Sequence, residues 1–176
     1  VTPREAFRDA GLVPGDIVVL QLGNVLEFVF VYLALQKIGV RPILALHTHR
    51  YRELRQFVEL SGATATITAD RSKDCDFIDI VNRVQADATS IRRKFVLGSA
   101  ADGFVSLGDL LAREPSRDVA EIEAIQAAID PCSPALFLLS GGTTGIPKMI
   151  PRSHNDYVCN SRLASRYTGI DEHSVL

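Results

Sequence analysis

Short apolar runs alternate along this sequence with stretches of helical periodicity. The first clear run, Ile17–Leu22, contains five aliphatic residues and one glutamine. A continuous run of this kind suits a strand that is covered on both faces. Further strands are predicted at 42–46, 64–68 and 94–97. Repeated strand–helix–strand order implies parallel strands joined by right-handed crossovers. The sequence therefore predicts an α/β fold, with a mostly parallel sheet flanked by helices.

Several predicted helices have recognisable ends. Thr2-Pro3-Arg4-Glu5 has the pattern of a capping box with proline at the first helical position, and Gly11 ends that helix. Asn24 is expected to cap a second helix that ends at Gly39. Because this second helix is apolar nearly all round, it is predicted to be buried. Further helices are expected at 51–61, at 77–84 with Asp74 or Asp76 as the cap, at 119–128, and at 154–168 before Gly169.

The remaining segments indicate how the chain is organised. A length of 176 residues fits one domain. Residues 99–133 are acidic and rich in small residues, so we expect a surface connector there. The chain then re-enters the core with a strand at 134–139. The sequence begins without methionine, and Ser174-Val175-Leu176 resembles the opening of another strand. We therefore expect a fragment of a longer protein.

Composition argues against several classes of function. The formal net charge of −2 does not predict a nucleic-acid partner, because nucleic-acid-binding domains carry a basic face. The most apolar stretch, Phe28–Leu35, is far too short to span a bilayer.

The three cysteines form no C-x-x-C pair, which argues against a disulfide framework or a zinc site and favours the cytoplasm. Cys159 is expected to be a small buried residue. His47 and His49 alone make a poor metal site, so a surface loop is expected there and no metal site is predicted.

The segment Ser140–Lys148 has the composition of an anion-binding loop. Its three glycines permit positive φ angles and bring backbone N–H groups close to an anion, where successive N–H groups form a concave nest. Ser140, Thr143 and Thr144 add hydroxyl donors, and Lys148 adds a positive charge. Each hydrogen bond to a charged phosphate oxygen contributes roughly 1.5–3 kcal/mol net. On composition alone, a simple turn between two strands is as acceptable as a phosphate site.

The spacing within this loop excludes the common nucleotide-binding loops. A Walker A loop needs Gly-Lys-Ser/Thr in direct succession, leading into a helix. Here Ile146 and Pro147 separate Gly145 from Lys148, and Pro147 and Pro151 would break a helix that began there. The dinucleotide fingerprint G-x-G-x-x-G also fails on spacing. A P-loop phosphotransferase is therefore disfavoured, and the predicted element is a strand, a loop and a short strand, forming a flap over phosphates.

A family resemblance favours the phosphate site over the simple turn. The run Leu138–Lys148 closely resembles the core phosphate-loop motif of the superfamily of acyl-CoA synthetases, peptide-synthetase adenylation domains and luciferases. Leu33–Pro42 and Gly11–Leu22 resemble other segments of that superfamily. Ile150–Tyr157 and Ala45–Arg50 are similar to its aryl-acid branch, the 2,3-dihydroxybenzoate–AMP and salicylate–AMP ligases, although a histidine at position 47 replaces the more usual proline.

This resemblance implies an ATP-dependent ligase. An aryl carboxylic acid of the 2,3-dihydroxybenzoate or salicylate type would react with ATP, in the presence of Mg²⁺, to give an aryl adenylate and pyrophosphate. The aryl group would then be loaded onto the phosphopantetheine thiol of an aryl carrier protein, in siderophore-type biosynthesis. Residues 1–176 would be an incomplete N-terminal, nucleotide-binding domain of such an enzyme, without a membrane partner. The alternatives are an acyl-CoA ligase of the same superfamily and a non-catalytic nucleotide-binding module.

The resemblance also implies roles for individual residues. His154 is expected either to orient substrate or nucleotide or to cap the helix that follows. In the family, the aryl pocket, the Mg²⁺-binding glutamate and the C-terminal lysine come later in the chain. No catalytic residue is therefore expected within residues 1–176, and the isolated chain is expected to be inactive. The residues implied to hold the β- and γ-phosphates, which Mg²⁺ would bridge, are Ser140, Gly141, Gly142, Thr143, Thr144, Gly145 and Lys148.

Overall fold

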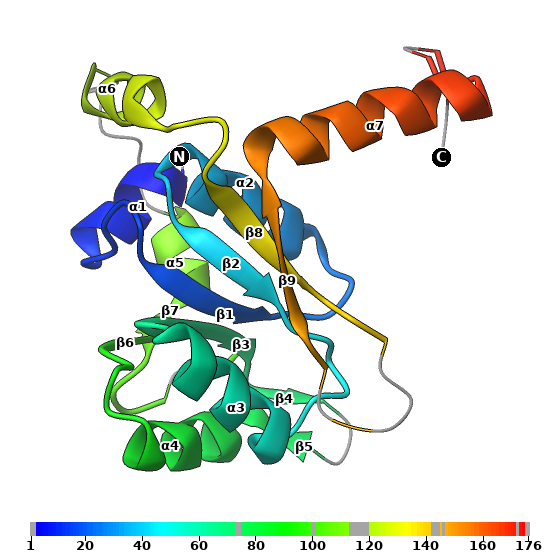
Figure 1. Ribbon diagram of the computed structural model, residues 1–176. Helices are drawn as coiled ribbons and strands as arrows, with labels where there is room; N and C mark the ends of the chain where they lie inside the picture. Colours follow the sequence, from blue (N-terminus) through cyan, green and yellow to red (C-terminus); the bar gives the residue numbers. More distant parts are fainter. Residues whose placement is uncertain are drawn as a thin grey trace.

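A seven-stranded sheet forms the centre of the computed structural model, which describes residues 3–72, 75–99, 101–112, 120–141, 145, 147–171 and 173–174. The strand order is β7-β6-β3-β1-β2-β8-β9 (Figure 1). Neighbouring strands run parallel, except that β9 is antiparallel to β8. The strands are β1 (Ile17–Gln21), β2 (Arg41–Leu44), β3 (Ala65–Ala69), β6 (Arg93–Leu97), β7 (Val105–Ser106), β8 (Pro134–Leu139) and β9 (Met149–Ser153).

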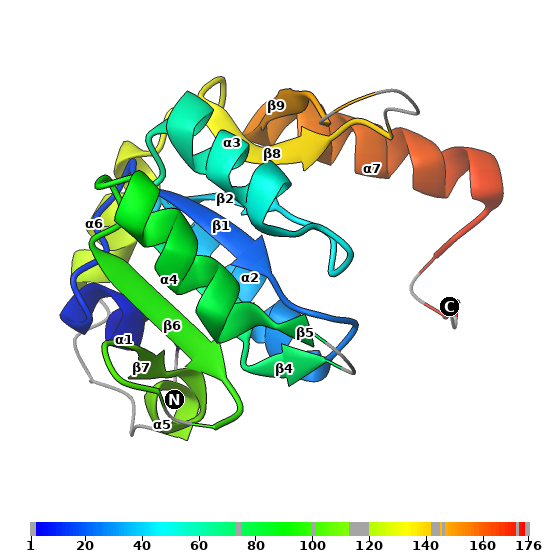
Figure 2. The same ribbon diagram turned by 90° about the horizontal axis from the view of Figure 1, so that it is seen from below.

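Helices cover both faces of this sheet (Figures 1 and 2). One face packs against α1 (Pro3–Asp9), α2 (Leu26–Lys37) and α5 (Leu107–Ala112), and α6 (Ala120–Ala128) lies beside α2. The other face packs against α3 (Tyr51–Ser61) and α4 (Phe77–Asp87). The last helix, α7 (His154–Thr168), follows β9 and contacts it. Among the described residues, no helix is both long and apolar enough to cross a lipid bilayer.

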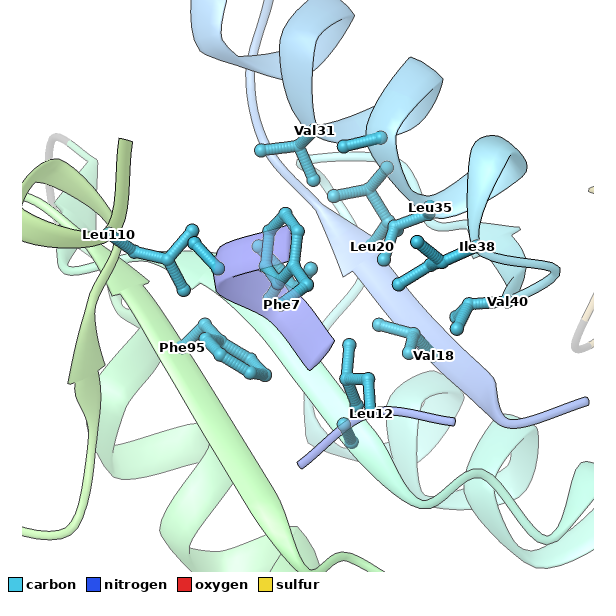
Figure 3. Close-up of a cluster of buried hydrophobic side chains, with 14 of the residues drawn as sticks. Phe7, Leu12, Val18, Leu20, Val31, Leu35, Ile38, Val40, Phe95 and Leu110 are labelled. Carbon is cyan, nitrogen blue, oxygen red and sulfur yellow. The ribbon is translucent and has the colours of Figure 1, made fainter. Parts of the chain in front are cut away.

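Alternate residues of the central strands serve two separate hydrophobic clusters. Val18 and Leu20 of β1 point into the cluster with α1 and α2, which also contains Phe7 and Phe95 (Figure 3). Val19, between them, belongs to the cluster with α3 and α4. A strand buried on both faces needs apolar side chains at successive positions, which explains the continuous apolar runs. The predicted α/β fold with a mostly parallel sheet is confirmed.

Most predicted elements are found close to their predicted bounds. The strand at 134–139 and the helices at 51–61 and 154–168 agree with β8, α3 and α7 to the residue. Gly62 and Gly169 end those two helices with φ angles of +66° and +70°, in the left-handed region where glycine carries no steric cost. Asp76 caps α4 as expected, because its side chain accepts a hydrogen bond from the backbone N–H of Asp79 at 3.0 Å. The alternative cap, Asp74, lies outside the described residues.

Helix α2 departs from its prediction in two ways. Its N-cap residue is Val25, whose side chain makes no capping hydrogen bond, so the expected cap at Asn24 is wrong. The helix is also buried on one side only: Leu35 is fully buried, whereas Leu26 and Leu33 are 66% and 50% exposed. A helix that lies on a sheet buries the side that faces the sheet, and the other side of α2 keeps exposed leucines.

The segment 99–133 contributes more to the fold than a connector would. Its strand β7 extends the sheet beside β6, and Leu107 and Leu110 of α5 are fully buried in the cluster with α1 and α2. Helix α6 agrees with the helix predicted at 119–128, and its Ile122 is buried. The short strands β4 (Arg71–Ser72) and β5 (Cys75–Asp76) pair as a small separate sheet that was not predicted. Cys159 is exposed on α7, so its expected burial is wrong.

A carboxylate joins β3 to β6 where these strands end. Asp70 follows β3 and accepts hydrogen bonds from the backbone N–H groups of Arg71 at 2.6 Å and Ser99 at 2.8 Å. These bonds, the one from Ser99 foremost, lower the pKa of Asp70. Gly98 has a φ of +119°, and a Cβ atom there would lie 2.4 Å from the carboxyl carbon of Asp70. Glycine is therefore required at position 98 both by backbone angle and by space.

The turn after β2 is held from several directions. The Gln21 amide donates hydrogen bonds to the carbonyls of Leu46 at 2.9 Å and His49 at 3.0 Å. The Leu46 N–H donates to Nδ1 of His49 at 3.0 Å, so Nδ1 is an acceptor and carries no proton. Burial lowers the pKa of His49; nearby Arg50 lowers it further, and Glu53 opposes the shift. His49 is buried against the ring of Phe57, not placed on a surface loop as expected.

Replacement of Gly98 by alanine should destabilise the fold. The substitution Gly98→Ala forces a side chain into a strained φ region and against Asp70, and strain of this type costs about 1–3 kcal/mol. Urea unfolding of the chain would measure the loss. The matched control is Gly62→Ala, which also has a positive φ but no heavy atom within 4 Å of the added Cβ. Equal losses in the two variants would contradict the proposed clash with Asp70.

The stability of the chain should fall on mild acidification, in part through His49. Because the pKa of His49 is lower in the folded state than in the unfolded chain, the folded state resists protonation. Its contribution is fully present above the unfolded value of about 6.5 and is lost as pH falls from there towards the lowered folded value. Urea unfolding between pH 7.5 and 5 should show a smaller fall for His49→Asn than for the unsubstituted chain. A fall that is unchanged in His49→Asn would refute this role.

Candidate functional site

The predicted phosphate loop begins where β8 ends. β8 runs parallel to β2, with Ile43 paired to Phe137, so both strands end at the same edge of the sheet as β1 and β3. β9 then returns antiparallel to β8, and the last pair before the loop is Leu139 with Met149. The strand, loop and short strand predicted from the two prolines are therefore present. Ligands of open α/β sheets bind outside the carboxyl ends of the strands, which is where this loop emerges.

Two hydrogen bonds close the base of the loop. The backbone N–H of Ser140 donates to the carbonyl of Lys148 at 3.0 Å. The backbone N–H of Lys148 donates to Oγ of Ser140, also at 3.0 Å. Since the Ser140 hydroxyl acts as an acceptor in this bond, its own hydrogen stays available for a further acceptor. Ser140 thus fixes the loop base and can still donate to a ligand.

The loop residues that the structure describes have open surroundings. Among the described residues, a Cβ atom added at Gly141 or Gly145 would meet no heavy atom within 4 Å. Lys148 is exposed and forms no ion pair with any residue in the described part of the chain. The predicted ligands Gly142, Thr143 and Thr144 lie outside the described residues.

His154 is placed far from the loop. It follows β9 at the end opposite Met149, and it lines a cavity of about 640 Å³ near Arg41 and Pro134, at the amino ends of the parallel strands. His154 comes six positions after Lys148, and extended chain at about 3.3 Å per residue makes this a span of roughly 20 Å. The cap of α7 is the side chain of Ser153, which accepts from the N–H of Asp156 at 3.1 Å. His154 therefore does not cap the helix, and it lies at the opposite end of β9 from Lys148.

The two histidines of the turn after β2 each pack against a phenylalanine ring. The ring of His47 packs against Phe77 at a centroid distance of 4.7 Å, and His49 contacts Phe57 at 5.3 Å. Within the described residues, no group of three or more histidine, cysteine or acidic side chains is arranged to hold a metal ion.

The described ends of the loop carry groups of a kind that can bind an anion. Among the described residues, the Ser140 hydroxyl keeps its own hydrogen for a further acceptor, Lys148 is an exposed cation, and Gly141 and Gly145 have open space around them. All are suited to an anion. The dual bonding of Ser140 was missed by sequence reasoning, which considered its hydroxyl only as a donor to phosphate. The strand–loop–strand pattern was a signal for the bond that this hydroxyl accepts, because the antiparallel return of β9 sets Ser140 across from Lys148.

Known proteins resemble this chain over most of its length. The chain is 39% identical to the salicyl-AMP ligase / salicyl-S-ArCP synthetase of Mycobacterium tuberculosis, over 89% of this chain and 26% of that protein. It is 36% identical to the vibriobactin-specific 2,3-dihydroxybenzoate-AMP ligase of Vibrio cholerae, over 96% of this chain and 30% of that protein. The chain thus spans less than a third of the length of these relatives.

Solved structures agree with the sequence relatives. The apo structure of MbtA from Mycobacterium smegmatis superposes with a TM-score of 0.81 at 34% identity, over 96% of this chain and 30% of that chain. A long-chain-fatty-acid-CoA ligase from Archaeoglobus fulgidus shares the fold with a TM-score of 0.79 at 18% identity, over 98% of this chain and 31% of that chain. The family model described as AMP-binding enzyme matches residues 5–176. With that match over nearly its whole length, the chain belongs to the family of AMP-binding enzymes, as its resemblance to the adenylate-forming superfamily predicted.

Proposed function

We propose that this chain is the ATP-phosphate-binding part of an enzyme that activates an aryl carboxylic acid, of the salicylate or 2,3-dihydroxybenzoate type, as its adenylate. The observation that carries the proposal is the closed loop base between Ser140 and Lys148, at the carboxyl edge of the sheet. The named activities of the two relatives at 36–39% identity support the choice of substrate class.

In the proposed reaction, a carboxylate oxygen of the aryl acid attacks the α-phosphorus of ATP. The bond between the α-phosphorus and the bridging oxygen breaks, and pyrophosphate leaves. Negative charge gathers on the phosphate oxygens as this happens, so catalysis depends on positioning and electrostatic stabilisation. Mg²⁺ bound to the β- and γ-phosphates would neutralise part of that charge.

The chain's own residues would hold the phosphate tail. The Ser140 hydroxyl and the backbone N–H groups of the glycines would donate to phosphate oxygens, with Thr143 and Thr144 as further donors. Lys148, at about 4 Å from a phosphate charge, would contribute roughly 4 kcal/mol at an effective dielectric constant of 20, before desolvation. The proposed ligand set is Ser140, Gly141, Gly142, Thr143, Thr144, Gly145 and Lys148. His154 has no assigned role in it, because it lies at the other edge of the sheet.

The thiol acceptor distinguishes two versions of this function. The M. tuberculosis relative is named for transfer to an aryl carrier protein, and a Streptomyces relative at 38% identity is named a salicylyl-CoA synthase. We favour the carrier protein and a cytoplasmic role in siderophore-type biosynthesis, since further relatives are named pyochelin synthase and vibriobactin-specific ligase. Residues 1–176 would then form an incomplete N-terminal domain, in which residues 99–133 link β6 to β8. Transfer of a radiolabelled aryl group to carrier protein but not to coenzyme A would support this version.

A chimera tests the proposed activity. Residues 5–176 would replace the matching part of the M. tuberculosis salicyl-AMP ligase, and salicylate-dependent exchange between ATP and pyrophosphate would be measured. We expect the chimera to be active and the isolated chain to be inactive. Lys148→Ala should reduce exchange about 100-fold, because it removes a charge aimed at the reacting phosphates. The matched control is Lys37→Ala, an exposed lysine on α2, which should be close to unchanged. A fully active Lys148→Ala chimera would rule out the phosphate role.

A second test separates loop closure from charge. Ser140→Ala removes the acceptor of the Lys148 N–H bond and a proposed phosphate donor, whereas Ser140→Thr keeps both. In the same chimera, Ser140→Ala should raise the KM for ATP about tenfold, corresponding to one lost hydrogen bond of about 1–1.5 kcal/mol. The KM for salicylate should stay near its original value, and Ser140→Thr should restore ATP affinity. If the KM for salicylate rose as much as the KM for ATP, general damage to the fold would be the better explanation.

A further inference from the structure

A small enclosed cavity lies between the sheet and the helices α3 and α4. The space inside it that a water-sized sphere can occupy is about 10 Å³. Most of its walls are aliphatic side chains from both helices and from the strands. Three polar residues interrupt these walls: Gln21 on β1, and Thr66 and Thr68 on β3. Because Gln21 pairs with Thr68 and Val19 with Thr66 in the parallel register of β1 and β3, all these side chains project from one face of the sheet.

The three polar residues are almost completely buried. Gln21 and Thr68 are each 1% exposed, and Thr66 is 4% exposed. Within the part of the chain that the structure describes, Oε1 of Gln21 and the Oγ1 atoms of both threonines have no hydrogen-bond partner. Buried polar atoms in native proteins are nearly always paired, with protein or with ordered water. Three such atoms around one cavity therefore require a common explanation.

The hydrogen bonds of the Gln21 amide exclude one simple explanation, namely that its oxygen and nitrogen are interchanged. Its Nε2 donates to the carbonyls of Leu46 and His49, at 2.9 and 3.0 Å. A flipped amide would set its oxygen against those two carbonyl oxygens, so the flip is not allowed. Oε1 is therefore fixed as an acceptor on the side of the amide away from the turn, and it needs a donor.

We infer that this cavity binds one ordered water molecule. Its size matches a single water and excludes any larger ligand. A water has two hydrogens to donate and two lone pairs to accept. It would donate to Oε1 of Gln21 and exchange hydrogen bonds with one or both threonine hydroxyls, which can donate and accept. Aliphatic neighbours such as Val58 and Val81 offer it no competing partner.

This water would tie the sheet interior to the turn at its carboxyl edge. The same Gln21 side chain that accepts from the water holds the carbonyls of Leu46 and His49. The two threonines would therefore act on the turn through a shared solvent molecule and the Gln21 side chain. Loss of the water would leave Oε1 of Gln21 without a donor.

Oxygen-17 magnetic relaxation dispersion counts long-lived internal waters and tests this site on the chain itself. The unsubstituted chain should show a long-lived water that is absent from Thr66→Val/Thr68→Val, since valine keeps the shape of threonine and removes its hydroxyl. A crystal structure at about 1.5 Å should show the same water within hydrogen-bonding distance of Oε1 of Gln21. The matched control is Thr64→Val, just before β3, whose hydroxyl bonds to the carbonyl of Ile17 at 3.5 Å and does not line the cavity.

The two measurements can also overturn the proposal. A dry cavity in the crystal, or direct bonds between Gln21 and the threonine hydroxyls, would refute it whatever the variants do. The same would follow if the double variant folded and retained the same number of long-lived waters. Because the unsubstituted chain is measured first, an unfolded double variant would still leave the water site decided.

Discussion

Burial of the central strands on both faces is the constraint on which the rest of this structure depends. Val18 and Val19 are neighbours in sequence, yet they belong to opposite hydrophobic clusters. Such a strand is stable only if helices cover both faces, and helices can do so only through crossovers between parallel strands. Parallel strands in turn end at one edge. The turn after β2, Asp70 after β3 and the loop after β8 all emerge at that edge for this one reason.

The antiparallel strand β9 changes the chemistry available at the edge. A crossover after β8 would have carried the chain away into a helix, as happens after β1 and β2. Instead, the chain returns at once, and residues eight positions apart, Ser140 and Lys148, face each other. A hydroxyl and an ammonium group are thereby held on the two sides of a glycine-rich loop. The two strands thus position a loop in which Gly141 and Gly145 have open space around them among the described residues.

Much of this arrangement could be predicted from the sequence. The ends of β8 and α7 follow from proline and glycine residues at or next to them. The strand–loop–strand form follows from Pro147 and Pro151. The apolar pattern of α2 could not say which side would meet the sheet, because Leu33 and Leu35 are equally apolar and only their positions relative to the sheet distinguish them. The close approach of the Asp70 carboxylate to Gly98 could not be predicted either, since these residues are brought together only when β6 lies beside β3.

Helix α7 has a different kind of support from every other long helix in the described chain. None of its residues is buried, and it is held by the Ser153 cap, by hydrogen bonds between hydroxyls and backbone carbonyls one turn earlier, and by its junction with β9. Local support of this kind gives little cooperativity with a hydrophobic core. The helix can therefore open and close as a separate unit, so its amide hydrogens should exchange with solvent through fraying, on a far shorter timescale than those of β1 and β3.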